Sequence, residues 1–259
     1  MNLQLQGKVI LVTGGAKGIG EAISRALADE GAVPVIVDRD AAAAERLRTQ
    51  LEAAGKSSEV ICCELTEPVA CRDAVNKTVE TTGRIDALVN NAGINDRVGL
   101  EHGGVDEFVK SLERNLFHVY NMTHFALPAL RRSRGSIVNI ASKTAVTGQG
   151  GTSGYAGAKG AILALTREWA VELLPYQIRV NAVVPAEVMT PLYEQWLATF
   201  PNPEQKLSSI ISRIPLETRM TKPEEIAATV LFLLSRQAAH ITGQHIFVDG
   251  GYVHLDRAL

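Results

Sequence analysis

Residues 9–38 read VILVTGGAKGIGEAISRALADEGAVPVIVD, and this stretch decides the fold. A short apolar run, Val9–Val12, precedes the glycine-rich turn Thr13–Gly20, a helical pattern follows, and a second apolar run ends at Asp38. A strand, a glycine-rich turn and a helix form the start of a β–α–β unit, in which glycines let the backbone approach a pyrophosphate at the helix N-terminus. The stretch therefore predicts a parallel α/β sheet that carries a dinucleotide site.

The same alternation of short apolar runs and helical patterns continues along the chain. The further runs are Val33–Val37, Val60–Cys63, Ile85–Val89, Ser136–Ile140, Ile178–Val183 and His245–Val248. The helical patterns are Gly20–Glu30, Ala41–Ala54, Glu67–Thr82, Val105–Arg132, Ser153–Leu174 and Pro223–Ser235. None of the runs alternates cleanly between apolar and polar residues, which is typical of strands covered on both faces of a parallel sheet. We expect a single doubly wound, Rossmann-like α/β domain over residues 1–259, with a seven-stranded parallel sheet and helices on both faces.

One stretch interrupts this order. Residues 186–222 contain prolines at 191, 201, 203 and 215 and the aromatic residues Tyr193, Trp196 and Phe200, without a strand pattern. A long insertion in a compact domain is usually a functional lid or a surface excursion. Because the insertion follows the end of a predicted strand, where ligands bind in open α/β sheets, we expect a lid over the substrate.

Composition and charge make several functions poor candidates. The chain has 26 Lys and Arg against 28 Asp and Glu, a formal net charge of −2, and so offers no basic excess for nucleic acid or an anionic membrane. No apolar run approaches the ~18 residues of a membrane span. Met1–Gln6 has neither the basic start nor the apolar core of a signal peptide. We expect a cytoplasmic protein with neither nucleic acid nor membrane as partner.

The cysteines predict neither disulfides nor a metal site. Cys62, Cys63 and Cys71 are an odd set, which argues against a disulfide framework in a reducing compartment. Cys62 and Cys63 lie in an apolar run without further ligands nearby, so we expect both to be small buried side chains.

An acid stands where a ribose-binding carboxylate would. Asp38 follows Gly20 by 18 residues and ends the second predicted strand. A carboxylate there accepts hydrogen bonds from the adenosine ribose and repels a 2′-phosphate, which favours NAD over NADP. Lys17 and Arg39 could instead meet such a phosphate, and Asp38 could be an ordinary acid beside a helix. The sequence Asn90-Asn91-Ala92-Gly93 after the fourth strand either lines the cofactor cleft or forms a loop with Asx-turn chemistry.

Tyr155 and Lys159 are four residues apart in a strongly helical segment, so they share one helix face. A tyrosine with a pKa of about 10 is a poor base at neutral pH, but a nearby ammonium and an oxidised nicotinamide would lower that pKa. Ser142 follows the fifth strand, where its hydroxyl could hydrogen-bond the reacting oxygen. Tyr–Lys pairs at this spacing are also common on exposed helices, so the pair gains its meaning from the other motifs.

In combination, these motifs resemble the short-chain dehydrogenase/reductase family over essentially the whole chain. The shared motifs are Thr13-Gly14-x3-Gly18-x-Gly20, Asn90-Asn91-Ala92-Gly93, Asn115, Ser142, Tyr155-x3-Lys159 and Val248-Asp249-Gly250-Gly251. The resemblance implies an oxidoreductase that transfers a hydride between a substrate hydroxyl or carbonyl and a nicotinamide, usually assembled as a homotetramer. Two positions depart from the family's pattern: Pro185-Ala186 replaces Pro-Gly, and Glu64-Leu65 replaces Asp-Leu or Asp-Val.

The resemblance also implies site residues. Tyr155 is the acid/base, Lys159 lowers its pKa and binds the nicotinamide ribose, Ser142 orients the substrate oxygen, and Asn115 holds a water in a proton relay. The cofactor-binding residues are Gly14, Lys17, Gly18, Ile19, Gly20, Asp38, Arg39, Glu64, Leu65, Asn91, Ala92, Gly93, Tyr155, Lys159, Pro185, Val188 and Thr190.

Three segments resemble bacterial sugar dehydrogenases of this family, which oxidise the anomeric hydroxyl of an aldose such as L-fucose to a lactone. They are Ser142–Gly151, Pro185–Tyr193 and the ending His254-Leu255-Asp256-Arg257. A sugar needs polar partners, because burying an unpaired polar group costs about 1–3 kcal/mol. The candidate substrate-binding residues are Asn95, Ser142, Lys143, Gln149, Tyr155, Glu187 and, for stacking, Trp196. Each could be an ordinary surface residue, and Glu187 could pair with a neighbour.

Two other functions stay open. A 3-oxoacyl thioester ketoreductase, or another short-chain alcohol dehydrogenase, would use the same scaffold, although such ketoreductases usually prefer NADP. A cofactor-binding regulator without catalysis is the non-enzymatic alternative.

Overall fold

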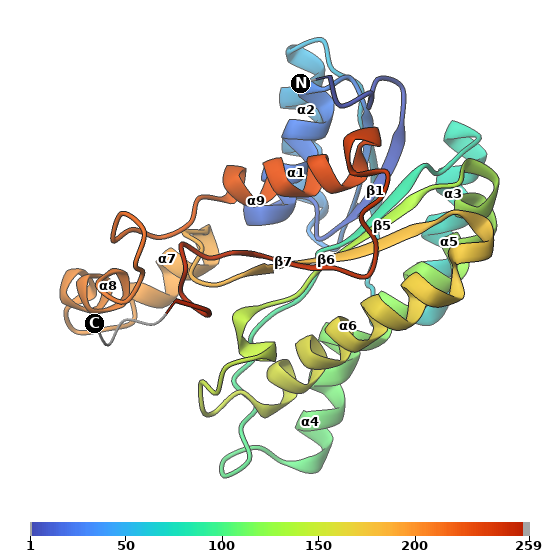
Figure 1. Cartoon of the computed structure of the whole chain (residues 1–259). Helices are drawn as coiled ribbons and strands as arrows, with labels where there is room; N and C mark the ends of the chain where they lie inside the picture. The colour runs from blue at the N-terminus through green and yellow to red at the C-terminus, as the bar shows by residue number, and fades with distance from the viewer. Residues whose placement is uncertain (1, 256–259) are drawn as a thin grey trace.

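Within residues 2–255, which the computed structural model describes, seven parallel strands form one sheet in the order β3-β2-β1-β4-β5-β6-β7 (Figure 1). The strands are β1 (Val9–Thr13), β2 (Val33–Asp38), β3 (Glu59–Cys62), β4 (Ala87–Asn90), β5 (Ser136–Ile140), β6 (Arg179–Pro185) and β7 (His245–Val248). The predicted seven-stranded parallel sheet is therefore confirmed, and the predicted runs agree with the strands to within about two residues at each end.

Helices cover both faces of this sheet. They are α1 (Gly18–Asp29), α2 (Ala41–Ala53), α3 (Pro68–Thr82), α4 (Val105–Leu112), α5 (His118–Ser133), α6 (Ser153–Glu172), α7 (Pro191–Leu197), α8 (Pro203–Ile211) and α9 (Pro223–Leu234). Figure 1 shows α1, α2 and α9 on one side of the sheet and α3, α5 and α6 on the other.

The strands read as continuous apolar runs because each face of the sheet has its own core. In β1, Leu11 packs into the core under α3, α5 and α6, whereas Ile10 and Val12 pack into the core under α1 and α9. All three side chains are at most 1% exposed. Successive side chains of a strand point to opposite faces, so a strand buried on both faces must be apolar at every position.

The order of the strands places the site. From β1 the chain crosses to β2 on one side, whereas β4 lies on the other side of β1. The loops after β1 and β4 therefore diverge and leave a crevice at the carboxyl ends of the strands, which is where open α/β sheets bind ligands. The glycine-rich turn follows β1, and Asn91 follows β4 at the same edge.

Two local expectations were wrong. The pattern over 105–132 is not one regular helix, because a π-helical segment (Glu113–Phe117) separates α4 from α5. Cys62 is exposed rather than buried, since it ends β3 at the edge of the sheet, whereas Cys63 is buried as expected and Cys71 is buried too.

Residues 186–222 form a lobe beside the sheet that contains α7 and α8 (Figure 1). Pro191 and Pro203 start these helices, at positions where a missing N–H costs nothing. A single β-bridge between Val188 and Thr221 joins the beginning of this segment to its end, so the two ends lie side by side. No strand was predicted here, and apart from this bridge the described residues form none.

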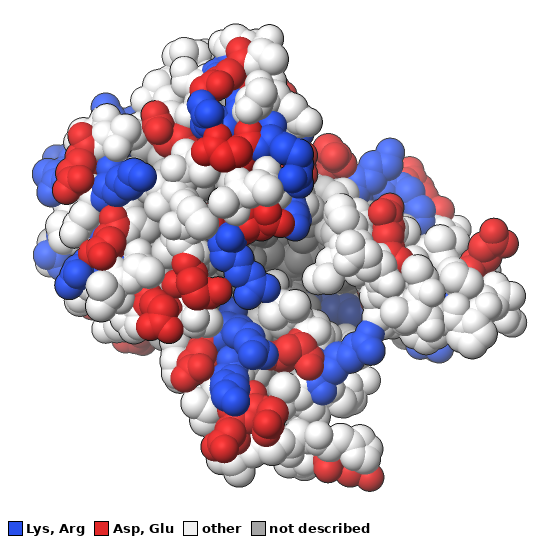
Figure 2. All heavy atoms as spheres, turned by 180° about the vertical axis from the view of Figure 1, so that it is seen from behind, with Lys and Arg blue, Asp and Glu red and all other residues white. Residues whose placement is uncertain are grey.

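The surface carries both signs of charge. Figure 2 shows Lys and Arg interspersed with Asp and Glu over one face, in keeping with the net charge of −2. Among residues 2–255, none of the helices has the length and apolar character to cross a bilayer.

Candidate active site

A cleft of about 640 Å³ lies at the carboxyl ends of the strands. Figure 2 shows the molecule hollowed between the lobe of α7 and α8 and the main body. Nearly all of the predicted cofactor-binding residues line the cleft: Gly14, Lys17, Gly18, Ile19, Asp38, Arg39, Glu64, Leu65, Asn91, Ala92, Gly93, Tyr155, Lys159, Pro185, Val188 and Thr190. The structure therefore brings together segments that lie far apart in the sequence.

The N-terminus of α1 opens on this cleft. Lys17 precedes the helix with extended backbone, and among the described residues no side chain caps the helix at that position. The first N–H groups of a helix have no intrahelical partner, so Gly18 and Ile19 can offer theirs to a ligand. Because the positive end of the helix dipole lies at the same place, this end of the cleft suits a phosphate.

Gly14 and Gly20 are required by close approach. Gly14 has a φ of 61°, and a Cβ there would lie 3.0 Å from the Cα of Ala92. A Cβ on Gly20 would collide with the carbonyl oxygen of Gly14. Gly20 itself does not line the cleft. It packs against the turn and is not placed to contact a ligand.

Hydrogen bonds fix the loop after β4 to the loop after β1. Asn91 donates from Nδ2 to the carbonyl oxygens of Thr13 and Gly14, both at 3.0 Å. The hydroxyl of Thr13 accepts from the N–H groups of Asn91 and Ala92. Of the two interpretations of this motif, the structure favours a loop that lines the cleft and is held rigid there.

Asp38 is held by two backbone contacts at the cleft wall. Its Oδ2 accepts from the N–H of Ala16 at 3.1 Å, and its Oδ1 accepts from the N–H of Asp40 at 3.0 Å. A carboxylate oxygen can accept more than one hydrogen bond, so both oxygens keep capacity for ribose hydroxyls.

The two cations that could have met a 2′-phosphate have acidic partners. Lys17 pairs with Asp40, and Nη1 of Arg39 lies 3.7 Å from Oε2 of Glu64. Both pairs are exposed and therefore weak, so they reduce but do not remove the capacity of these cations to bind an anion.

The three reacting groups converge at the other end of the cleft. Ser142 follows β5, Tyr155 and Lys159 lie one turn apart on α6, and all three line the cleft. Nζ of Lys159 donates to the carbonyl oxygen of Ile140 at 2.7 Å and lies 5.6 Å from the centre of the Tyr155 ring. The helix thus presents the phenol and the ammonium on one face, as the spacing predicts.

Burial dominates the acid–base behaviour of this group. It raises the pKa of Tyr155 to about 12, against a smaller opposite effect of the hydrogen bond with Ser142. It lowers the pKa of Lys159, which is only 2% exposed, to about 8. Ser142 and Lys159 alone therefore do not produce the expected lowering of the Tyr155 pKa, because desolvation of the phenolate raises the pKa by more than these groups lower it.

Asn115 lies behind the cleft wall instead of in it. Its Oδ1 accepts from the N–H of Ile94 at 2.7 Å, and its Nδ2 donates to the carbonyl oxygen of Ser111 at 2.9 Å. A Cβ on Gly93 would lie 3.1 Å from Oδ1 of Asn115 and 3.4 Å from Nζ of Lys159. Asn115 therefore fixes the loop beside Lys159, and its π-helical segment is of a kind frequent at functional sites. Its role in a proton relay stays a prediction.

Several predicted substrate-binding residues do not line the cleft. Of that set, the residues that do are Asn95, Ser142 and Tyr155. Within residues 2–255, Lys143 and Glu187 pair with each other, and Gln149 is exposed in the loop before α6. Trp196 packs edge-to-face between Tyr193 and Phe200 rather than presenting its face to the cleft. Asp256 and Arg257 lie outside the described residues.

Sequence reasoning missed residues that adjoin the ones it found. Many of these unpredicted lining residues directly follow a strand or a motif, and Arg114 and His118 lie close to Asn115 in the sequence. They could have been found as sequence neighbours of predicted residues. The additional lining residues are Asp40, Cys63, Thr66, Ile94, Arg114, His118, Ile140, Ala141, Ala186, Pro191, Leu192, Tyr193 and Gln195.

His118 is a buried histidine at the cleft wall. The ring is 1% exposed, and its Nε2 lies 3.0 Å from the carbonyl oxygen of Arg114, which makes Nε2 the protonated nitrogen. Burial, with the charge of Lys159, lowers its pKa to about 4, so the ring is neutral at physiological pH. Its Nδ1 has no hydrogen-bond partner among the described residues.

The residues present thus fit a nicotinamide dinucleotide. The free N–H groups of α1 suit the pyrophosphate, and Asp38 suits the adenosine ribose. Glycine at position 14 leaves the backbone of the turn bare towards the cleft.

Comparison with known proteins agrees with this geometry. A family model described as enoyl-(acyl carrier protein) reductase matches residues 14–253. L-fucose dehydrogenase of Bos taurus is 36% identical over 252 residues, which cover 97% of this chain and 91% of that protein. The 3-oxoacyl-[acyl-carrier-protein] reductase FabG of Thermotoga maritima is 37% identical over 252 residues, 97% of this chain and 100% of that protein.

Solved structures are similar over the whole chain. The crystal structure of Cj0485 dehydrogenase has 48% sequence identity and a TM-score of 0.95, covering 100% of this chain and 99% of that one. Ligand-free aldohexose dehydrogenase of Thermoplasma acidophilum has 33% identity and a TM-score of 0.88, covering 99% and 98%. The chain belongs to the short-chain dehydrogenase/reductase family, whose members are nicotinamide-dependent oxidoreductases that act on CH–OH groups of small molecules.

Proposed function

We propose that this protein is an NAD-dependent dehydrogenase that oxidises the anomeric hydroxyl of an aldose, such as L-fucose, to a lactone. The observation that carries the reaction is the convergence of Ser142, Tyr155 and Lys159 at one end of a cleft whose other end holds Asp38. The residues therefore combine proton transfer with a binding site for a dinucleotide.

In oxidation, Ser142 and Tyr155 would hold the substrate hydroxyl, and the Tyr155 oxygen would take its proton. Lys159, held by the carbonyl oxygen of Ile140, keeps a positive charge near the phenol and so favours the phenolate. When bound, the nicotinamide ring supplies the acceptor for the hydride that leaves the substrate carbon. The same residues run the reverse direction, with Tyr155 as proton donor.

The preference for NAD rests on Asp38. The Ala16 and Asp40 N–H groups hold its carboxylate at the cleft wall, where it would accept from ribose hydroxyls and repel a 2′-phosphate. We expect Asp38→Ala to reduce the NAD:NADP ratio of kcat/KM about tenfold or more, because the repulsion is lost. Asp29→Ala, which removes an exposed acid at the end of α1, is the matched control and should leave the ratio unchanged. An unchanged ratio in Asp38→Ala would refute the ribose assignment.

The sugar substrate is supported by two of the relatives, which are named L-fucose dehydrogenase and aldohexose dehydrogenase. The lining residues Asn95, Tyr193 and Gln195 could supply hydrogen bonds to sugar hydroxyls. Residues 186–195 supply part of the cleft wall, which supports the proposal that the insertion covers the substrate.

A 3-oxoacyl thioester ketoreductase is the second candidate, because FabG of Thermotoga maritima is similar to the same extent. The experiment that separates the two is a panel of aldoses, polyols and 3-oxoacyl thioesters with NAD(H) and NADP(H), followed by absorbance of the reduced nicotinamide. We expect the highest kcat/KM for an aldose with NAD. Turnover of only the thioesters would reverse the assignment, and dinucleotide binding without any turnover would favour a regulator.

We further propose a homotetramer. Apolar side chains of α4, α5 and the π-helical segment between them are exposed in the single chain, namely Phe108, Val109, Phe117 and Tyr120. Exposed apolar surface of this extent is typical of an interface. Light scattering of the purified protein tests the proposal, and the mass of a monomer would contradict it.

A further inference from the structure

Four side chains from separate segments meet next to Ser142. Nζ of Lys143 pairs with Oε1 of Glu187, in the loop after β6. The hydroxyl of Tyr193, on α7, donates to Oε2 of Glu187 at 2.8 Å. Nζ of Lys143 also lies 4.1 Å from the centre of the Tyr252 ring, in the turn after β7. We call Lys143, Glu187, Tyr193 and Tyr252 the clamp.

The clamp is buried, which makes it more than an ordinary surface ion pair. The side chains of Lys143 and Glu187 are 10% and 14% exposed. A pair buried to this extent is stable only when further hydrogen bonds satisfy its charges, and such pairs serve best to fix one arrangement of packed segments. Glu187 meets this condition, since each of its carboxylate oxygens has its own partner.

Three members of the clamp adjoin the cleft. Lys143 directly follows Ser142, Glu187 lies between the lining residues Ala186 and Val188, and Tyr193 lines the cleft itself. Further contacts lie near the start of α7: Thr190 accepts from the N–H of Tyr193 at 3.3 Å, and Val188 bridges to Thr221. The clamp thus ties α7 to the loop of Ser142.

We propose that Glu187 is a positioning residue that, through Lys143 and Tyr193, fixes α7 relative to Ser142 and so sets the shape of the substrate end of the cleft. It would act without contacting the substrate, because Glu187 does not line the cleft. This role concerns the same site as the proposed function and depends on that function only for the identity of the substrate.

Hydrogen exchange tests the clamp without any substrate. In Glu187→Gln the shape of the side chain is kept but its charge is lost, and we expect the amides of residues 192–197 to exchange about tenfold faster than in the wild type. Tyr193→Phe removes the link to α7 alone and should change the same amides in the same direction. The amides of β1 should be unaffected in both. Glu45→Gln, which breaks an exposed ion pair with Arg48 on α2, is the matched control.

Kinetics then test the consequence for the substrate. With whichever substrate the panel identifies, we expect Glu187→Gln to raise KM about tenfold while kcat changes less than about threefold, with an unchanged Kd for the dinucleotide. A failure of the aldose assignment would change the substrate used but not the exchange result, so the two hypotheses are tested separately.

A purely structural role is tested by Lys143→Met combined with Glu187→Leu. Replacing a buried ion pair by apolar residues of similar volume often restores stability, but it cannot restore the hydrogen bond from Tyr193. We expect this double variant to unfold near the wild-type midpoint and still to show the raised KM and the fast exchange. Wild-type exchange in residues 192–197 of Glu187→Gln, or a wild-type KM in the double variant, would overturn the proposal.

Discussion

Tyr155 and Lys159 occupy a part of the cleft where burial disfavours charge on both. The pKa of the phenol is raised to about 12 and that of the ammonium is lowered to about 8, each mainly by desolvation. The protein therefore does not hold a ready phenolate at neutral pH. It holds a neutral phenol next to an ammonium, at a place where one further positive charge in the cleft would favour ionisation of the phenol.

Tyr155→Phe tests the proton transfer. The substitution removes only the hydroxyl, so we expect turnover to fall about 10²–10⁴-fold, the usual contribution of general acid–base catalysis. Binding of NADH, followed by nucleotide fluorescence, should be nearly unchanged. In the wild type the rate of oxidation should rise with pH, because the deprotonated phenol is the base. A variant with near-normal turnover would exclude Tyr155 as the acid/base.

Lys159→Met tests the cost of burying the ammonium. A lowered pKa in the folded state means that the unfolded chain binds more protons between about pH 8 and pH 10.5, so wild-type stability rises with pH across that window and carries the full penalty below it. The shift corresponds to about 3 kcal/mol, and the lost hydrogen bond to the Ile140 carbonyl offsets about 1 kcal/mol of it.

We therefore expect the free energy of unfolding of the inactive Lys159→Met variant to be about 2 kcal/mol higher than that of the wild type at pH 7. The difference should shrink as the pH approaches 10.5, where the wild-type lysine is neutral in both states. Urea unfolding at several pH values measures both quantities. Destabilisation at pH 7 would show that Lys159 is held by favourable charge interactions instead.

At the scale of single residues, the sequence predicts the reacting groups better than their neighbours. Ser142, Tyr155 and Lys159 are identified by the family's motifs in combination, because helical spacing and position after a strand alone leave their role open. The pairing of Lys143 with Glu187 joins residues 44 positions apart and depends on how two loops fold, which spacing cannot reveal. The pKa of Tyr155 was misjudged for a related reason, because burial is a property of the whole cleft.

At the scale of elements, the junction of β1 and α1 is the most constrained part of the site. A Cβ on Gly20 would collide with the carbonyl oxygen of Gly14 and would lie 2.7 Å from Nδ2 of Asn91. The turn, the helix and the loop after β4 are thus packed so closely that only glycine fits at this position.

Gly20→Ala should therefore destabilise the protein by about 1–3 kcal/mol and weaken dinucleotide binding, because the turn must move to admit the methyl group. Gly157→Ala in α6 is the matched control, since a Cβ there has open space around it. It should stabilise the fold by about 0.5–1 kcal/mol through the higher helix propensity of alanine. Thermal unfolding and NADH titration of both variants make the comparison, and equal stability of the two would contradict the packing argument.

The elements themselves are predictable where burial is complete. The run 136–140 matches β5 to the residue, because this strand lies inside the sheet and is buried at every position. The π-helical segment at Glu113–Phe117 leaves no such mark, since it widens one turn without changing the helical pattern. The helices within residues 186–222 were not predicted, because short helices that begin with proline contain too few residues to show a clear helical period.

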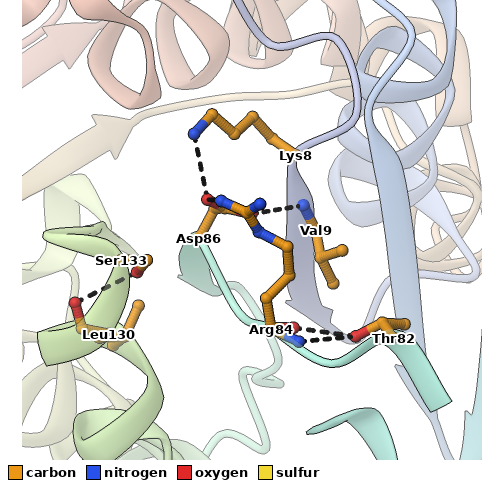
Figure 3. A network of polar contacts seen from close by, with 7 residues as sticks. All are labelled: Lys8, Val9, Thr82, Arg84, Asp86, Leu130 and Ser133. Atoms are coloured by element: carbon orange, nitrogen blue, oxygen red, sulfur yellow. Dashed lines mark hydrogen bonds and ion pairs between the residues drawn. The ribbon is translucent and has the colours of Figure 1, made fainter.

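At the scale of the whole molecule, the two ends of the sheet have different tasks. The carboxyl ends of the strands carry the cleft, whereas the start of β4 carries a network around Asp86 (Figure 3). Lys8 donates to Oδ1 of Asp86 at 3.1 Å, and Arg84 donates to both carboxylate oxygens, at 2.6 and 2.8 Å. Oδ2 also accepts from the N–H of Val9 at 3.0 Å, so this carboxylate joins the beginnings of β1 and β4.

This network should stabilise the fold without affecting the chemistry. Burial alone would raise the pKa of Asp86, but its hydrogen bonds with Arg84, Val9 and Lys8 hold the pKa below its usual value. A lowered pKa in the folded state gives stability that is complete above the unfolded pKa of about 4 and is lost as the pH falls through the folded pKa.

Asp86→Asn keeps the shape of the side chain and removes its charge, so we expect a loss of about 2 kcal/mol in the free energy of unfolding at pH 7. The loss should diminish below about pH 4, where the wild-type carboxyl is itself becoming protonated. Because the network lies at the end of the sheet opposite the cleft, kcat, KM and the Kd for the dinucleotide should stay at wild-type values at temperatures where the variant is folded. Urea unfolding measures the loss of stability, and steady-state kinetics on the same preparation measure whether kcat and KM are unchanged. A variant of wild-type stability, or one with an altered KM, would show that the two ends of the sheet do not divide stability and chemistry in this way.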